Sequence, residues 1–88
     1  MQEPVTFSDD EILAMHKTIG KNVKRYREEK GISQLQLSYA MGYKSVSLVS
    51  AAELATDGKH FNLEHLYKIA KILEIDMKEL IPSKFCSK

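Results

Sequence analysis

Two short helical segments joined by a glycine turn constrain the fold of this chain more than any other feature. The first is expected over residues 34–41, where Ser33 supplies an N-cap and Gly42 marks the end. The second is expected from Ser45, as its cap, to about Leu54. Their apolar residues recur at helical spacing, and the first segment spans barely two turns. The pattern therefore predicts a pair of short helices about a tight turn.

Longer amphipathic segments flank this pair. Ser8, with Glu11 three residues later, forms a capping-box pattern that predicts a helix start near Asp9. Lys30-Gly31 supplies the stop, and Gly20 could divide the segment into two helices. The apolar residues of this segment lie at spacings of three and four: Ile12, Met15, Ile19, Val23 and Tyr26.

The second half of the chain predicts two more helices and no strand pair. Asn62 caps a fourth helix, with loop chemistry before it in residues 56–60. Asp76, with Glu79 three residues later, opens a short last helix that Pro82 follows. The fold class expected from these segments is all-α.

With 88 residues the chain is long enough for one compact domain, and its size makes oligomerisation a serious expectation. We expect an acidic N-terminal arm and the start of the first helix in residues 1–16, the domain itself in 17–82 and a flexible tail in 83–88. The single cysteine, Cys86, excludes an internal disulfide and fits a reducing cytosol. Neither an export signal nor a run of about 18 apolar residues occurs, so we expect a cytoplasmic protein without a membrane partner.

Charge is distributed unevenly, although the formal net charge is only +1. Residues 1–16 carry four acidic and no basic groups, whereas residues 17–60 carry eight basic and four acidic groups. A basic centre beside an acidic arm suits a phosphate-facing surface with a separate end that avoids DNA. A few excess lysines are common on any solvated face, so charge alone is a weak argument.

The order and spacing of several motifs resemble one known family. The residues that carry the resemblance are Arg27 to Gln34, then Leu37, Ala40, Met41 and Gly42, then Val49, Ser50 and Glu53, then Leu66 to Ala70. Together they resemble the lambda-repressor-like, Cro-type (XRE) helix-turn-helix family. The resemblance covers about two thirds of the chain, residues 22–81.

This resemblance implies a five-helix bundle in which helices two and three form the helix-turn-helix and helix three lies in the major groove of DNA. It also implies a structural ion pair between Arg27 and Glu53. The helix-five region often pairs two subunits in the family, and here it offers Ile75, Met77, Leu80, Ile81 and Phe85. The chain departs from the family pattern in three places. Its turn looks one residue longer than usual, and Ala51 and Ala52 stand where family members often carry polar residues. The acidic arm is an addition to the pattern.

Candidate DNA contacts cluster around the expected recognition helix. Gln34 resembles the family glutamine that holds a phosphate and braces that helix, and the alternative is an exposed polar residue. Lys44 and the nearby serines can reach base edges or phosphates, or merely form the turn and cap. Leu48 could meet a thymine methyl or turn into the core, and Tyr43 could reach a phosphate or pack. The full set is Gln34, Tyr43, Lys44, Ser45, Ser47, Leu48, Ala51, Lys59 and His60.

The sequence predicts a sequence-specific regulator of transcription that binds double-stranded DNA at an inverted-repeat operator as a homodimer and acts as a repressor. An enzyme is not expected, because there is no phosphate-binding loop, inward carboxylate pair or nucleophile arrangement. His16, His60, His65 and Cys86 lack metal-ligand spacing, so we expect neither a metal nor a cofactor. The alternative is an antitoxin or another module that docks a protein partner.

Overall fold

The structure, a computed structural model, describes residues 4–82. Within them it has four α-helices, two 3-10 turns and no strand, so the all-helical fold class is confirmed. The five-helix count is not confirmed: the expected short last helix is a single 3-10 turn over residues 77–79, and Pro82 soon after restricts the backbone before it and cannot continue a helix. In chain order the elements are α1 (Asp9–Glu29), α2 (Gln34–Ala40), α3 (Ser47–Leu54), η1 (Thr56–Gly58), α4 (Leu63–Leu73) and η2 (Met77–Glu79).

Helix α1 is continuous, so Gly20 does not divide it. It begins as the sequence predicts, with the Ser8 Oγ accepting a hydrogen bond from the Glu11 backbone N–H at 3.1 Å. Gly20 instead marks the place where α1 and α3 touch. A Cβ atom there would lie 2.7 Å from the carbonyl oxygen of Ala52 and closer still to that of Glu53. The absent side chain therefore lets the two helices approach at backbone distance.

A side-chain cap explains where α2 begins. The N-cap residue of α3 offers no such cap, and α3 begins later than the sequence predicts. Ser33 and Gln36 form a reciprocal capping box at the start of α2. Helix α3 starts at Ser47, two residues after the expected cap, and its N-cap residue Val46 has no side-chain oxygen to offer. Ser45 still contributes, because its Oγ accepts from the Ser47 backbone N–H at 3.3 Å.

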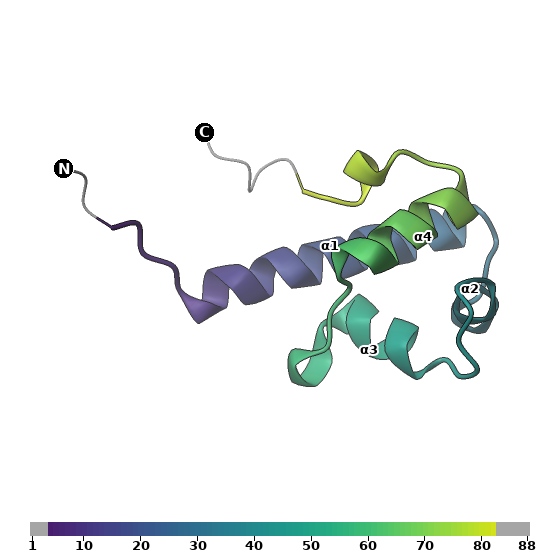
Figure 1. The fold of residues 1–88 in the computed structure, drawn as a ribbon, viewed down its shortest axis with the longest axis horizontal. Helices are drawn as coiled ribbons and strands as arrows, with labels where there is room; N and C mark the ends of the chain where they lie inside the picture. Colours follow the sequence, from purple (N-terminus) through teal and green to yellow (C-terminus); the bar gives the residue numbers. More distant parts are fainter. Residues whose placement is uncertain (1–3, 83–88) are drawn as a thin grey trace.

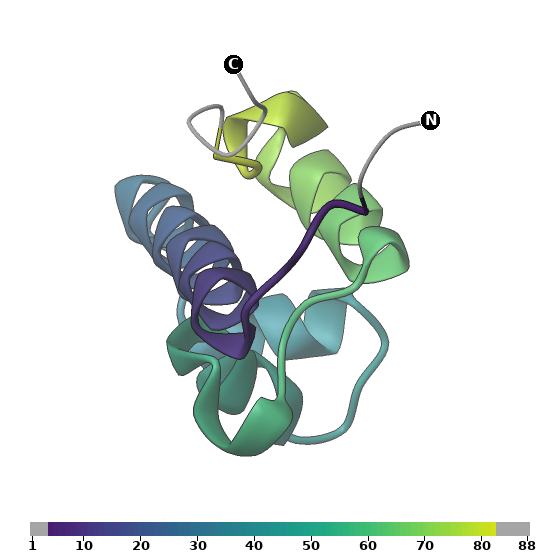
Figure 2. The same ribbon diagram turned by 90° about the vertical axis from the view of Figure 1, so that its left-hand side faces the viewer.

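The core lies where α1 and α4 run side by side above α2 and α3 (Figures 1 and 2). Residues from every helix and from the segment after η2 fill it, and the most buried side chains are Val23, Leu37, Val49, Ile69, Leu73 and Leu80. Two hydrogen bonds fasten the η2 region to α1: Tyr26 Oη donates to Glu79 Oε1 at 2.9 Å, and Asn22 Nδ2 donates to the Leu80 carbonyl at 3.1 Å. The C-terminal segment is thus part of the domain's packing.

This packing changes the expected dimer surface. Leu80 is 0% exposed, so it belongs to the core of a single copy and cannot serve as a dimer contact in this fold. Ile75 and Met77 are half-buried against the same core. Ile81 keeps 37% of its surface exposed, and Phe85 lies outside the described residues. Of the described residues in the expected set, Ile81 is the most exposed, and Ile75 and Met77 keep part of their surface accessible.

Ser38 provides a test of the packing around α2. Its side chain is 0% exposed, and its Oγ has no hydrogen-bond partner. Because an unpaired buried hydroxyl is unfavourable, Ser38→Ala is expected to raise the free energy of unfolding by about 1 kcal/mol. The matched change Ser33→Ala removes a used cap and is expected to lower it by about 1 kcal/mol. Urea unfolding followed by circular dichroism measures both; a loss of stability in Ser38→Ala would show that its hydroxyl is bonded.

Candidate nucleic-acid interface

Helix α3 presents an outward stripe formed by residues at positions i, i+3, i+4 and i+7. Val49, Ala52 and Glu53 are buried on its inner side. The opposite side carries Ser47, Ser50, Ala51 and Leu54, of which Ser47 and Leu54 are exposed and the middle two half-buried. We call these four residues the α3 stripe. A helix held with one face outward and short side chains on it can enter the major groove closely.

A buried hydrogen-bonded network fixes the position of α3. Arg27 of α1 binds Glu53 through two bonds, Nε to Oε2 at 2.7 Å and Nη2 to Oε1 at 3.1 Å. The third guanidinium nitrogen, Nη1, donates to the Ile32 carbonyl at 2.9 Å. Gln34 Nε2 of α2 also donates to Glu53 Oε1, at 2.9 Å. One carboxylate therefore ties α1, α2 and α3 together.

Gln34 thus braces α3 through its side-chain amide. That amide has a second N–H, so the bond to Glu53 leaves one donor for a phosphate. The side chain is half-buried, at the first position of α2.

Hydroxyl groups gather at the start of α3. Ser45 Oγ lies 3.2 Å from Ser47 Oγ, to which it donates, and Ser50 Oγ donates to the Ser47 carbonyl at 3.3 Å. Lys44, next to them in the sequence, is exposed. The arrangement leaves hydroxyl lone pairs and one cation at the surface where α3 begins, and these can bind base edges and phosphate oxygens.

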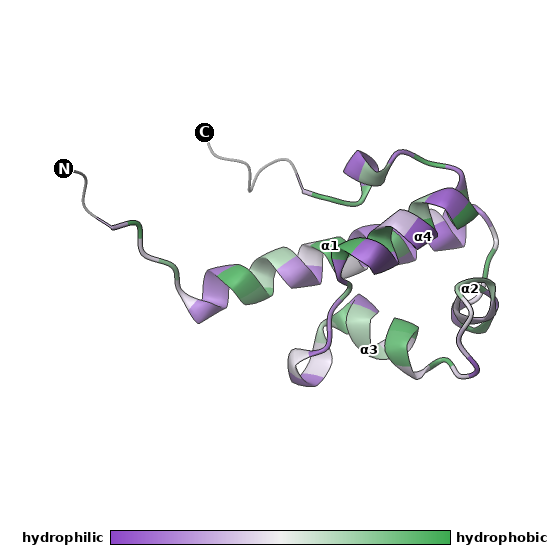
Figure 3. Cartoon of the chain, viewed as in Figure 1, coloured by the Kyte–Doolittle hydropathy of each residue, from purple (hydrophilic) through white to green (hydrophobic). Residues whose placement is uncertain are grey.

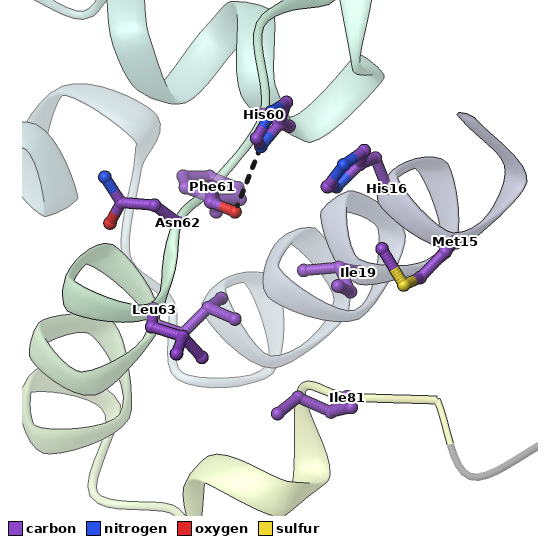
Figure 4. A pocket seen from close by; sticks show the side chains of 9 residues that line it. Met15, His16, Ile19, His60, Phe61, Asn62, Leu63 and Ile81 are labelled. Carbon is purple, nitrogen blue, oxygen red and sulfur yellow. Dashed lines mark hydrogen bonds between the residues drawn. The ribbon is translucent and has the colours of Figure 1, made fainter. Parts of the chain in front are cut away.

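Other expected contacts lie elsewhere. Tyr43 and Leu48 are half-buried and pack against the core, and the Tyr43 ring meets the His65 ring edge-on at 6.1 Å between centroids. Lys59 is exposed in the segment that leaves η1, at the opposite end of α3 from α2 (Figure 1). His60 turns toward α1, where its ring stacks on His16 at 3.7 Å between centroids (Figure 4). The structure therefore brings Lys44, Ser45, Ser47 and Ala51 together and separates His60 from them.

Two residues of the α3 stripe, Ser50 and Leu54, were not among the DNA contacts expected from the sequence. Leu54 is 66% exposed. With a helix that starts at Ser47, the helical spacing from the buried Val49 and Ala52 places Ser50 and Leu54 on the outer side.

The outer surface of α3 carries no charge. Its one charged residue is Glu53, which is buried. In Figure 3 α3 is mostly green to pale, with one purple stretch, whereas α1 and α4 carry many strongly hydrophilic positions. Such a surface avoids repelling phosphates, but it offers few charged donors to base edges.

The histidine that helps to begin α4 is expected to make the stability of the domain depend on pH. His65 Nδ1 accepts a hydrogen bond from the Asn62 backbone N–H at 3.0 Å, which requires the unprotonated nitrogen. Burial lowers the pKa of His65 below its usual value of 6.5, and nearby Lys68 and His60 lower it further against the opposing effect of Glu64. Burial, then His60, also lowers the pKa of His16.

Both lowered pKa values mean that the unfolded chain binds more protons than the folded one. Their contribution to stability is therefore fully present above pH 6.5 and is lost as the pH falls below it. We expect a lower urea midpoint at about pH 5.5 than at about pH 7.5. His65→Gln keeps a side-chain acceptor at the same capping position but cannot titrate, so its midpoint should depend less on pH. Equal pH dependence in both proteins would contradict this role of His65.

Comparison with known proteins agrees with this geometry. The family model HTH_3, described as helix-turn-helix, matches residues 23–80. The chain therefore belongs to this Cro/C1-type (XRE) helix-turn-helix family of DNA-binding transcription regulators, whose domain is typically non-enzymatic. No curated protein and no solved structure matches it significantly.

Residues 4–82 lack two other structural features that would point to a function. No group of three or more His, Cys, Asp or Glu side chains there is arranged to hold a metal ion. Among the helices of the same residues, none has both the length and the apolar character needed to cross a membrane.

Proposed function

We propose that this protein is a sequence-specific repressor that binds an inverted-repeat operator as a homodimer. The α3 stripe of each copy enters one of two successive major grooves, about 34 Å apart. Lys44 and the free N–H of Gln34 bind phosphates and set the register, and repression follows because the bound dimer blocks polymerase. The observation that carries this proposal is the uncharged α3 stripe, held outward by the Arg27–Glu53–Gln34 network.

The small side chains of the α3 stripe bear on specificity. Serine hydroxyls donate to or accept from several bases, while Ala51 and Leu54 can contact thymine methyl groups. With few charged or amide side chains on α3, part of the selectivity comes from how easily the operator deforms.

DNA binding across a salt series tests this function. Binding to a selected operator should be tighter than to a scrambled duplex, and the logarithm of affinity should fall linearly with the logarithm of salt concentration. Lys44→Ala should weaken binding to both duplexes equally and reduce the salt slope by about one. The matched control is Lys78→Ala, an exposed lysine on η2, which should leave both quantities unchanged.

A second pair of variants tests which surface meets DNA. Leu54→Glu places a negative charge on the α3 stripe and should abolish operator binding by repelling phosphates. Tyr67→Glu places the same charge on α4 at a side chain of similar exposure, 56% against 66%, and should leave binding intact. Equal effects of the two changes would contradict the placement of α3 in the groove.

The alternative function is a module that docks a protein partner. It is favoured by the acidic first turn of α1 and by the exposed Leu63 and Tyr67 of α4. If the protein did not bind DNA even at low salt, this result would favour the protein-docking function.

A further inference from the structure

Two histidine rings join α1 to the segment that leaves η1, outside the α3 stripe and the network that holds it. His16 lies on α1, and His60 lies between η1 and α4. Their rings are nearly parallel, at 12°, with centroids 3.7 Å apart. Both also line the pocket drawn in Figure 4. We call this pair the histidine stack; it connects two segments that are distant in the sequence.

The place of His16 in the stack suits a neutral ring. Its Nδ1 is buried and has no hydrogen-bond partner within the described part of the chain. A protonated imidazole carries an N–H on both ring nitrogens, so protonation would leave a donor unpaired at this buried position. An unpaired buried donor on a charged group is strongly unfavourable. Acid therefore disfavours the position that His16 has in the structure.

His60 is in different surroundings. Its side chain is exposed, and its Nδ1 lies 3.4 Å from the carbonyl oxygen of Phe61, which can accept a hydrogen bond from a protonated nitrogen. His60 can therefore hold a proton without leaving its place. A cation on this ring then opposes a second cation on His16, because the two centroids are only 3.7 Å apart. Protonation of both rings thus favours their separation.

No negative charge is placed to compensate two cations in the stack. Among residues 4–82, neither ring forms an ion pair with a carboxylate. The carboxylates on the elements around the stack are exposed or already paired: Asp57 on η1 is exposed, Glu53 of α3 binds Arg27, and Glu64 of α4 pairs with Lys68. The other groups on these elements that are or become positive are Lys17 of α1, Lys59 before His60, and His65 of α4.

We propose that the histidine stack is a pH-sensitive latch on the segment that follows α3. While His16 is neutral, the stack holds this segment against α1. When acid protonates both rings, they repel each other and the segment is released at His60. Phe61 is only 3% exposed and stays in the core, so the release is confined to the residues between α3 and Phe61.

Proton linkage gives the direction of this change. Burial, then the neighbouring His60, lowers the pKa of His16 below its usual value of 6.5, and a ring released to water regains that value. The closed latch therefore binds fewer protons than the open one. It is favoured above pH 6.5, and opening increases as the pH falls below that value.

The latch also has a consequence for DNA binding, and this consequence rests on the proposed function. Lys59 directly precedes His60, so the closed stack fixes where this exposed cation lies relative to α3. Opening frees Lys59 and adds positive charge beside it, which strengthens binding to phosphates of any sequence and loosens the register. We expect the preference for operator over scrambled duplex to fall several-fold between about pH 7.5 and about pH 5.

Proton NMR of the full chain without DNA tests the latch itself. The wild type should show a nuclear Overhauser contact between the two rings at about pH 7.5 and lose it as the pH falls to about 4.5. Far-UV circular dichroism at the same pH values verifies that the helices remain. Loss of the ring contact only together with the helical signal would overturn a local latch.

Three variants make the test specific to this pair of rings. His16→Phe keeps a planar ring that can stack but cannot be charged, so its contact with His60 should persist in acid. His60→Phe removes the neighbouring charge, so His16 should titrate at a higher pH than in the wild type. The matched control is His65→Gln, which removes a titrating histidine of α4 but leaves both rings of the stack. Its ring contact should still be lost in acid.

The outcomes separate the latch from the proposed function. A ring contact that persists in the wild type while both histidines titrate would overturn the latch, and so would equal loss of the contact in His16→Phe. Loss in the wild type and in His65→Gln, but not in His16→Phe, would support it. Fluorescence anisotropy at the same pH values measures the operator preference. An open latch with an unchanged preference would overturn the consequence for DNA, whereas no DNA binding at any pH would overturn the proposed function and leave the latch standing.

Discussion

Replacing Arg27 by methionine is expected to lower the free energy of unfolding by about 3 to 5 kcal/mol, because it leaves the Glu53 carboxylate buried without its partner. The side chains of Arg27 and Glu53 are only 8% and 1% exposed, so water cannot take over the lost bonds. Since small domains have a total stability of about 5 to 15 kcal/mol, much of the protein should be unfolded or close to it. Urea unfolding at neutral pH measures the loss.

Two controls separate the buried pair from a general effect of losing an arginine. Arg25→Met breaks an exposed pair with Glu29, whose side chains are 63% and 55% exposed, and should cost less than about 1 kcal/mol. The double variant Arg27→Met/Glu53→Leu removes both buried charges and should recover most of the stability lost in the single variant. Equal losses from Arg25→Met and Arg27→Met would show that Glu53 is not held as the structure describes.

The beginnings of three helices could be predicted because their caps are local. Ser8, Ser33 and Asn62 each accept a hydrogen bond from a backbone N–H three residues later, so the residues that decide the start are neighbours in the sequence. The N-cap residue of α3 makes no such bond. The helix expected from Ser45 therefore starts only at Ser47. The expected short last helix is one 3-10 turn, because Asp76 at its N-cap makes no side-chain cap hydrogen bond and Pro82 soon follows.

The site was predictable where it depends on a family pattern and unpredictable where it depends on tertiary packing. The residues of the Arg27–Glu53 pair were named from the resemblance, and the structure places them in contact. The burial of Leu80 and the stacking of His60 on His16 depend on how distant segments meet. Periodicity within one segment carries no information on such contacts, so it could not predict where the side chains of Leu80 and His60 lie.

Gly20→Ala is the other change with a large expected effect. In the middle of a helix this change normally stabilises by up to about 1 kcal/mol, because alanine is the better helix former. Here the new Cβ would meet the backbone carbonyls of Ala52 and Glu53, one of them at 2.7 Å. Neither is the mobile end of a side chain, so α1 and α3 must separate. We expect a loss of about 3 kcal/mol or more.

The sign of this effect identifies its cause, since helix propensity and helix contact predict opposite results at Gly20. Lys21→Ala, at the exposed next position of α1, should change the free energy of unfolding by less than about 0.5 kcal/mol. Because α3 must move to accept the methyl group, the folded fraction of Gly20→Ala should also bind operator DNA more weakly, which fluorescence anisotropy at low temperature measures. A Gly20→Ala protein as stable as the wild type would show that α1 and α3 lie further apart than the structure places them, so that this contact does not fix the position of α3.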